Sequence, residues 1–349
     1  MSASQSIAAP YTFPFLIGVA LVALVISVTA SIGFGAVPIP ADTVWGIALN
    51  HILPDTVEVD WSAGRDNIVW EIRFPRILLG AMVGAGLATV GTVLQAATRN
   101  PLADPHLLGV SSGAALGAVA AMMHVGLIFG LATLPLFAFV GALLATTLVL
   151  GISRERGYIS PDRLVISGVA VSFVCMALAN LLIFLGDHRA AHSVIFWMLG
   201  GLGLAQWSHL WYPAIALALG LAFLLLQGRQ INALMAGEET ALTLGINTTR
   251  LRFSLFVVCA LITGVMVAFS GTIGFVGLMI PHVLRFVVGG DNRRLLPLSA
   301  LIGAIFLVWV DVVARKIMAP EELPIGIVTG LMGGIAFIWI SCARKRPNQ

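Results

Sequence analysis

Long apolar runs, separated by short polar breaks, make up most of this chain. Each run is close to the ~20 residues that a helix needs to cross a bilayer. Strict alternation over about ten residues would indicate strands of a membrane barrel, and the runs do not alternate. The pattern therefore predicts ten transmembrane helices, over residues 14–34, 76–97, 107–124, 127–151, 164–186, 209–227, 253–270, 273–289, 298–313 and 325–342.

The composition agrees with this pattern. Of the 349 residues, 59% are hydrophobic and 10% are charged, and the mean hydropathy is +1.00. Soluble domains contain about 45–50% apolar and about 25% charged residues, so a soluble globular protein is excluded. We expect an all-α polytopic membrane protein, with residues 1–349 forming a single domain in contact with membrane lipid. Residues 1–12 contain no Lys or Arg, which favours a retained first helix over a signal peptide.

The basic residues predict the orientation. An even number of helices puts both termini on one side, where thirteen of the 19 Lys and Arg residues fall, against six on the other side. Because basic residues concentrate in cytoplasmic loops, we expect cytoplasmic termini and a location in a bacterial inner membrane. The longest outer loop then covers about 35–72 and the longest cytoplasmic loop about 228–252, while 187–208 is expected to hold a short outer surface or re-entrant helix.

A polar hinge, Arg99–Pro105, separates two of the apolar runs. Its two prolines, Pro101 and Pro105, prevent one helix from passing through it. The segment that follows is rich in Gly, Ala and Ser, which allow helices to approach closely. A polar break beside closely packed helices is typical of a pathway and not of an anchor. Glycine pairs at helical spacing are expected to pack helices within the chain: Gly80 and Gly84, Gly113 and Gly117, Gly326 and Gly330.

The cytoplasmic loop contains a short segment with the features of a helix. Glu238 and Glu239 fall in its expected first turn, where the helix dipole favours anions, and Gly245 suits a left-handed cap. Leu242 and Leu244 are apolar residues in a loop that faces water. Either the segment is a solvated linker, or it is a docking helix for a cytoplasmic partner.

Several motifs in order resemble those of the FecCD-type permeases, which are membrane subunits of ABC importers for iron-siderophores, haem and cobalamin. The resemblance extends over about residues 68–342. The motifs are Asn100–Pro105, Leu108–Ser111, Gly237–Gly245, Gly274–His282 and Glu322–Gly326.

The resemblance implies the type II ABC importer architecture: a homodimer of ten-helix permeases, two cytoplasmic ATPase subunits and a periplasmic substrate-binding protein. It also implies ATPase docking by Glu238, Glu239, Leu242, Leu244 and Gly245. The chain has no G-x-x-x-x-G-K-[ST] motif of its own. We therefore expect no catalytic site and no cofactor on this chain, with ATP and magnesium on the partner ATPase.

Basic residues also occur at the outer end of the second helix, against the general trend. Arg73 and Arg76 could pair locally with Glu71 or with lipid phosphate, or could bind carboxylates of a partner protein. The resemblance places contacts with the binding protein at Arg73, Arg76 and Arg315. Asp311 precedes Arg315 by four residues near the outer end of its helix.

The resemblance further implies two cytoplasmic gates. Asn100, Pro101 and Leu102 would close the pathway around the dimer axis, and Ser160 with Pro161 would form a second constriction. The family has a small polar pair at the second position, so Pro161 is a departure from its pattern. Ordinary turns are the alternative interpretation of both loops.

The sequence does not decide which of the family's chelates is transported. His188 and His192 lie four residues apart near the outer mouth, a spacing that could contact haem iron, although solvated histidines are the simpler interpretation. Haem is the first candidate, followed by a ferric siderophore and cobalamin. No nucleic-acid partner and no metal site are expected.

Two other classes of function fit the sequence less well. An ion-coupled secondary transporter needs a carboxylate deep in a helix, and such residues are scarce here. An intramembrane enzyme needs an activated nucleophile, and Ser111 and Ser112 have no histidine or lysine placed to activate them.

Overall fold

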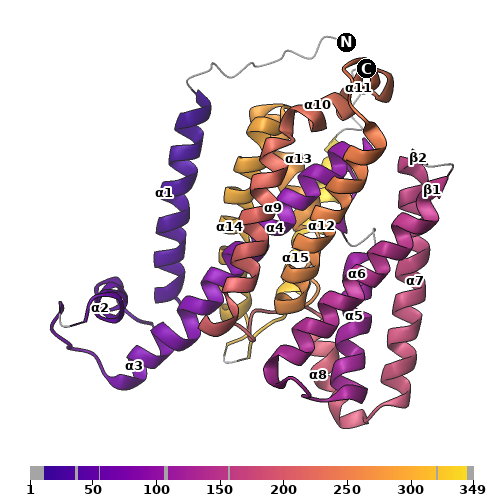
Figure 1. Ribbon diagram of the computed structural model, residues 1–349. Coiled ribbons are helices and arrows are strands. Elements are labelled where there is room, and N and C mark those ends of the chain that lie inside the picture. Colours follow the sequence, from indigo (N-terminus) through magenta and orange to yellow (C-terminus); the bar gives the residue numbers. More distant parts are fainter. Residues whose placement is uncertain are drawn as a thin grey trace.

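The computed structural model describes residues 12–35, 38–54, 56–105, 109–155, 158–319 and 321–343. Within these ranges the chain is helical almost throughout (Figure 1). Two strands of two residues each, β1 (Arg154–Glu155) and β2 (Tyr158–Ile159), pair in an antiparallel hairpin.

Every apolar run predicted from the sequence overlaps a helix. In the part of the chain that the structure describes, seven helices are long and apolar enough to cross a membrane, and three apolar helices (α5, α13 and α15) are shorter, so the number of crossings stays a prediction. The ten helices are α1 (Thr12–Gly33), α4 (Phe74–Thr98), α5 (Val110–Ala120, continued by a π-helical turn over Ala121–Val125), α6 (Thr133–Ser153), α7 (Pro161–Leu185), α9 (Trp211–Leu226), α12 (Thr248–Ser270), α13 (Val276–Val288), α14 (Asn292–Lys316) and α15 (Ile325–Ala343).

The two long segments expected between membrane helices contain short helices. Residues 35–72 contain α2 (Ala41–Ile52) and α3 (Ala63–Asn67), and a π-helical turn over Ile68–Arg73 leads into α4. The buried Trp61 ring packs against Gly46, and together with Ile77 of α4 and Val308 of α14 this segment forms a small second core.

Residues 228–252 likewise contain α10 (Gly228–Ala236) and α11 (Glu238–Thr243). The next helix, α12, begins five residues before the start expected from hydropathy, because the Asn247 side chain caps it by accepting a hydrogen bond from the Arg250 backbone N–H at 2.9 Å. The predicted helix over 187–208 is confirmed in part as α8 (His188–Met198).

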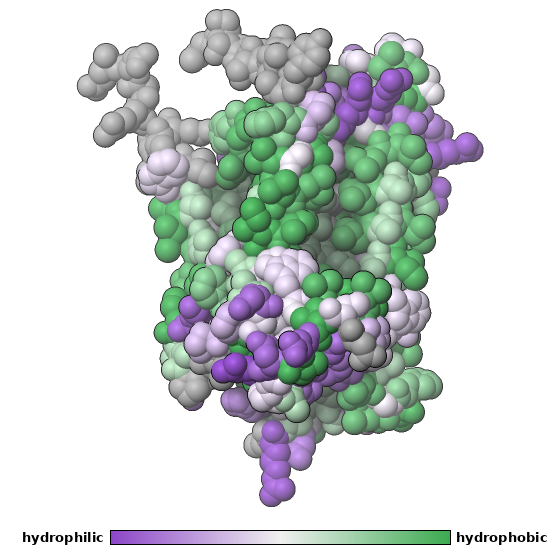
Figure 2. Space-filling view, turned by 90° about the vertical axis from the view of Figure 1, so that its left-hand side faces the viewer, coloured by the Kyte–Doolittle hydropathy of each residue, from purple (hydrophilic) through white to green (hydrophobic). Residues whose placement is uncertain are grey.

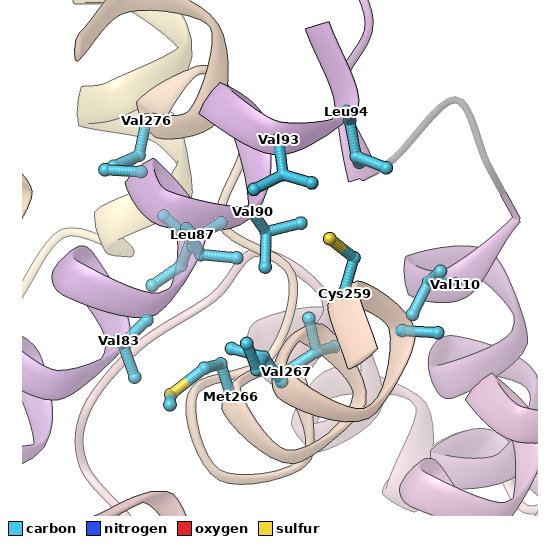
Figure 3. Close-up of a cluster of buried hydrophobic side chains, with 14 of the residues drawn as sticks. Val83, Leu87, Val90, Val93, Leu94, Val110, Cys259, Met266, Val267 and Val276 are labelled. Carbon is cyan, nitrogen blue, oxygen red and sulfur yellow. The ribbon is translucent and has the colours of Figure 1, made fainter. Parts of the chain in front are cut away.

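The main core surrounds α4, whose residues are almost all buried. Figure 3 shows Val83, Leu87 and Val90 of α4 close to Met266 and Val267 of α12. This core orients the end of α4 from which the hinge leaves.

Glycines allow α4 to contact its neighbours closely. A Cβ atom on Gly84 would lie 2.1 Å from the carbonyl oxygen of Gly303 in α14, and one on Gly91 would lie 2.0 Å from that of Gly277 in α13. A larger residue would force the helices apart. Gly113 meets Gly141 of α6 in the same way, so the predicted close packing is confirmed at Gly84 and Gly113, whereas a Cβ atom on Gly330 would have no neighbour within 4 Å.

The molecule has two distinct ends (Figure 1). We call the end with α10, α11 and the hairpin the α11 end, and the end with α2, α3 and α8 the α8 end. Figure 2 shows the side on which α1 and α2 lie, where hydrophobic side chains cover a broad flank and hydrophilic ones gather toward the two ends. This distribution fits a chain that sits in a bilayer with both ends in water.

Candidate functional site

The predicted hinge is a true break between helices. α4 ends at Thr98, and Arg99 follows in the left-handed conformation with a φ of 51°. The Asn100 Oδ1 atom then accepts a hydrogen bond from the Leu102 backbone N–H at 2.9 Å. Leu102 has an exposed apolar side chain. A helix break across the described residues 99–105 is thus confirmed, and the gating role of Asn100, Pro101 and Leu102 stays a prediction.

The second predicted gate lies at the start of α7. Ser160 precedes the helix in an extended conformation, and its carbonyl oxygen accepts a hydrogen bond from the Leu164 N–H at 3.0 Å. Pro161 occupies the first helical position, where a missing N–H costs nothing. The proline that departs from the family pattern therefore suits the local backbone, and Ser160 follows directly on the β1–β2 hairpin.

A cavity of about 590 Å³ lies between α5, α7 and α8. Its α7 residues recur at the spacing of one helix face, and none of its lining residues carries a charge. A largely apolar passage with scattered polar groups can let a bulky molecule through without a proton relay or a tight charged site. The lining residues are Ser111, Ser112, Ala115, Ser172, Met176, Asn180, Ile183, Ile195, Met198, Leu199 and Thr272.

The cavity extends from the helix that follows the hinge to the α8 end. Ser111 lies in the first turn of α5, and its buried hydroxyl has no hydrogen-bond partner among the described residues. Met198 ends α8 at the other extreme. The structure therefore brings the start of α5 and the end of α8, which the sequence treated separately, to the same cavity.

The predicted docking segment is a helix at the α11 end, as expected. α11 begins at Glu238, and Gly245 has a φ of +76°, the predicted left-handed cap. Leu242 is 56% exposed and Leu244 65% exposed, although both are apolar, and Glu239 is exposed as well. The segment thus presents apolar side chains on a polar end of the molecule, as a partner-binding helix would.

Glu238 differs from Glu239, Leu242 and Leu244 because its side chain is hydrogen-bonded to other residues of the same chain. Its carboxylate accepts hydrogen bonds from both terminal nitrogens of Arg252 at 3.2 Å, and from the Thr248 hydroxyl at 2.9 Å. Glu238 therefore joins α11 to the start of α12, while Glu239, Leu242 and Leu244 form the outward surface.

The three arginines expected at the outer side come together at the α8 end of α4 and α14. Asp311 connects two of them: its Oδ1 atom accepts from Arg76 Nε at 2.9 Å, and its Oδ2 atom accepts from Arg315 Nε at 2.9 Å. Arg73 and Arg315 both donate to backbone carbonyls where α1 ends, at Ile32 and Phe34 respectively, each at 2.7 Å.

All three guanidinium groups are buried, and each has a partner within the chain. Arg76 also pairs with Glu322, whose Oε2 atom lies 2.7 Å from Arg76 Nη1. Glu322 is 46% exposed at its side chain, so this contact is the side of the cluster that faces water. A carboxylate from another protein would have to take the place of Glu322 on Arg76.

The two histidines lie on α8, and the cavity geometry does not involve His192. His192 is exposed and is not among the residues that line the cavity, whereas Ile195 and Met198 of the same helix are. The His188 side chain lies outside the described residues. Contact of either histidine with haem stays a prediction.

A model of the FecCD transport family matches residues 23–343. The chain belongs to the FecCD transport family. This finding confirms the resemblance carried by the sequence motifs, and it identifies the hinge, the cavity and α11 as parts of an ABC importer permease.

Relatives in the FecCD family carry names with different cargoes. The hemin transport system permease protein of Yersinia pestis is 38% identical over 96% of this chain and 97% of its own. The cobalamin import system permease protein of Halobacterium salinarum is 41% identical over 88% of this chain and 80% of its own. A solved structure described as an inward-facing conformation of a metal-chelate type ABC transporter superposes with a TM-score of 0.81, at 31% identity, over 93% of this chain and 97% of its own.

Sequence reasoning missed two residues that organise these surfaces. Glu322 was noted only as part of a motif, and Arg252 only as a basic residue on the cytoplasmic side. A charged residue directly before an apolar run, as Arg252 is, could have signalled a buried ion pair, because burial of an unpaired charge is costly.

Proposed function

We propose that this FecCD permease forms the homodimeric pathway of an ATP-driven importer that moves a metal chelate, with haem the first candidate, from periplasm to cytoplasm. The α11 end is the cytoplasmic end in this proposal, in keeping with its basic loops. The observation that carries the proposal is the uncharged cavity of about 590 Å³ that joins the helix after the hinge to α8. Asn100–Leu102 would gate its cytoplasmic exit, with Ser160 and Pro161 at a second constriction.

The assembly in this proposal includes a second copy, two ATPases and a binding protein. α7 lines the cavity with one face and exposes Phe173 and Phe184 beside it, which offers an apolar surface to the second copy. Exposed Leu242 on α11 and Leu244 directly after it offer a second apolar surface, to an ATPase. Ferric siderophore and cobalamin are the alternative cargoes, and the relative named for cobalamin keeps the latter open.

Uptake by the reconstituted complex tests the cargo. We expect proteoliposomes that contain the permease, its ATPase and its binding protein to accumulate haem when ATP is supplied on the ATPase side. Ferric siderophore and cobalamin, measured in parallel, are expected to enter more slowly. Uptake of cobalamin alone would replace haem as the cargo, and uptake driven by an ion gradient without ATPase would refute the importer itself.

Binding-protein docking makes a prediction about Glu322. If Arg76 receives a carboxylate of the binding protein, Glu322 competes for the same guanidinium nitrogen. Glu322→Gln should then tighten docking, whereas Arg76→Glu should weaken it by roughly tenfold or more, since it replaces an attractive charge with a repulsive one. Titration of the binding protein against permease in nanodiscs measures both affinities. Unchanged affinity in both variants would remove Arg76 from the docking surface.

A further inference from the structure

Arg252 is a fully buried guanidinium, with none of its surface exposed, near the start of α12. A buried charge is stable only when it is paired and hydrogen-bonded. Its Nη1 and Nη2 atoms donate to Glu238 Oε1 and Oε2, both at 3.2 Å, and Nη1 also donates to the Ile159 carbonyl oxygen at 3.4 Å. One side chain therefore joins three segments: α11, α12 and strand β2.

The two partners of Arg252 belong to, or directly precede, segments with a predicted function: the docking helix α11 and the second gate. Glu238 is the first residue of α11, the helix that exposes Leu242 and Leu244. Ile159 directly precedes Ser160, the first residue of the second predicted gate.

The local backbone allows α11 to move as a short unit while this contact holds. Gly237, with a φ of +130°, and Gly245, with a φ of +76°, flank the helix in conformations that other residues rarely adopt. At the other side, the Ile159 side chain is buried in the main core, and the Ser160 carbonyl begins the hydrogen bonding of α7. A displacement of Ile159 would therefore reach the first turn of α7.

We propose that Arg252 is a positioning residue that transmits movement of α11 to the loop before α7. A two-pronged Arg–carboxylate pair in a buried setting has a fixed geometry, so α11 and β2 shift together and do not slide past each other. Lysine cannot replace this function, because one ammonium group lacks the planar fork that holds a carboxylate and a carbonyl at once. The inference rests on the proposed function, in which α11 receives the ATPase and Ser160 lines a gate.

The test follows the gate directly. The three native cysteines are replaced by alanine, Ser160→Cys is introduced, and its alkylation rate is measured in the complete complex with and without ATP. In this background we expect ATP to change the rate several-fold. Adding Arg252→Lys should abolish that change while the ATPase still copurifies and hydrolyses ATP near the level of the unsubstituted complex. Arg250→Lys, at an exposed position two residues away, is the matched control and should leave the change intact.

The outcomes separate this inference from the proposed function. If Arg252→Lys keeps the full ATP-dependent change, the relay is wrong even though the importer stands. If hydrolysis and the alkylation change fall in equal proportion, Arg252 serves only the fold of the docking helix, and the relay is again refuted. If the unsubstituted complex neither takes up a chelate nor alters Ser160→Cys labelling with ATP, the proposed function fails first.

Discussion

Replacing Leu242 and Leu244 with aspartate should abolish binding of the ATPase to the permease and, with it, ATP-driven uptake. Both leucines are exposed at the α11 end, Leu242 on α11 and Leu244 directly after it, on the segment that receives the ATPase in the proposed function. Central apolar contacts of an interface each contribute on the order of 2 kcal/mol, and burial of an unpaired carboxylate would add to that loss. We expect the affinity of the ATPase to fall by a factor of at least about 100.

The measurement is copurification of the ATPase with tagged permease, followed by uptake in proteoliposomes. The double substitution of Leu242 and Leu244 by methionine is the matched control, because methionine keeps the apolar area and should keep binding. The fold should survive in both variants, since exposed positions contribute within about 0.5 kcal/mol to the free energy of unfolding. An ATPase that still binds the aspartate variant would show that it docks elsewhere.

The membrane helices were predictable because each one buries or exposes a long apolar surface that local composition reveals. The start of α12 was missed by hydropathy, since its first turn is polar, yet Asn247 three residues before Arg250 is a capping signal that the sequence contains. The small core around Trp61 was not predictable, because it depends on how α2 packs against Ile77 of α4 and Val308 of α14, which are distant in the sequence.

The site residues show the same division between local and distant contacts. Asp311 and Arg315 lie one helical turn apart, so their pairing could be expected from the sequence. The partners of Arg76 are 235 and 246 residues away: the packing of α4 against α14 brings Asp311 to it, and Glu322 reaches it from the segment between α14 and α15. Arg252 and Ile159 are 93 residues apart, so the link between docking helix and gate loop likewise needed the fold.

Asp311→Asn is expected to destabilise the permease strongly, because Asp311 is the carboxylate that Arg76 and Arg315 share. Asp311 has no exposed surface, and its carboxylate faces Arg76 and Arg315, which are also buried. Asparagine keeps the shape but removes the charge that both guanidinium groups share. Removing one partner of a buried ion pair costs roughly 3–5 kcal/mol, because it leaves the other charge uncompensated.

Thermal unfolding in detergent, followed by circular dichroism, measures the effect. Glu322→Gln is the matched control: it belongs to the same cluster but is half-exposed, so its loss should cost about 0–1 kcal/mol. Adding Arg315→Gln to Asp311→Asn should recover part of the stability, since it removes one of the two charges left without a carboxylate. Equal melting temperatures for Asp311→Asn and Glu322→Gln would mean that water or lipid headgroups compensate the arginines, and that the cluster is open to a partner even at its centre.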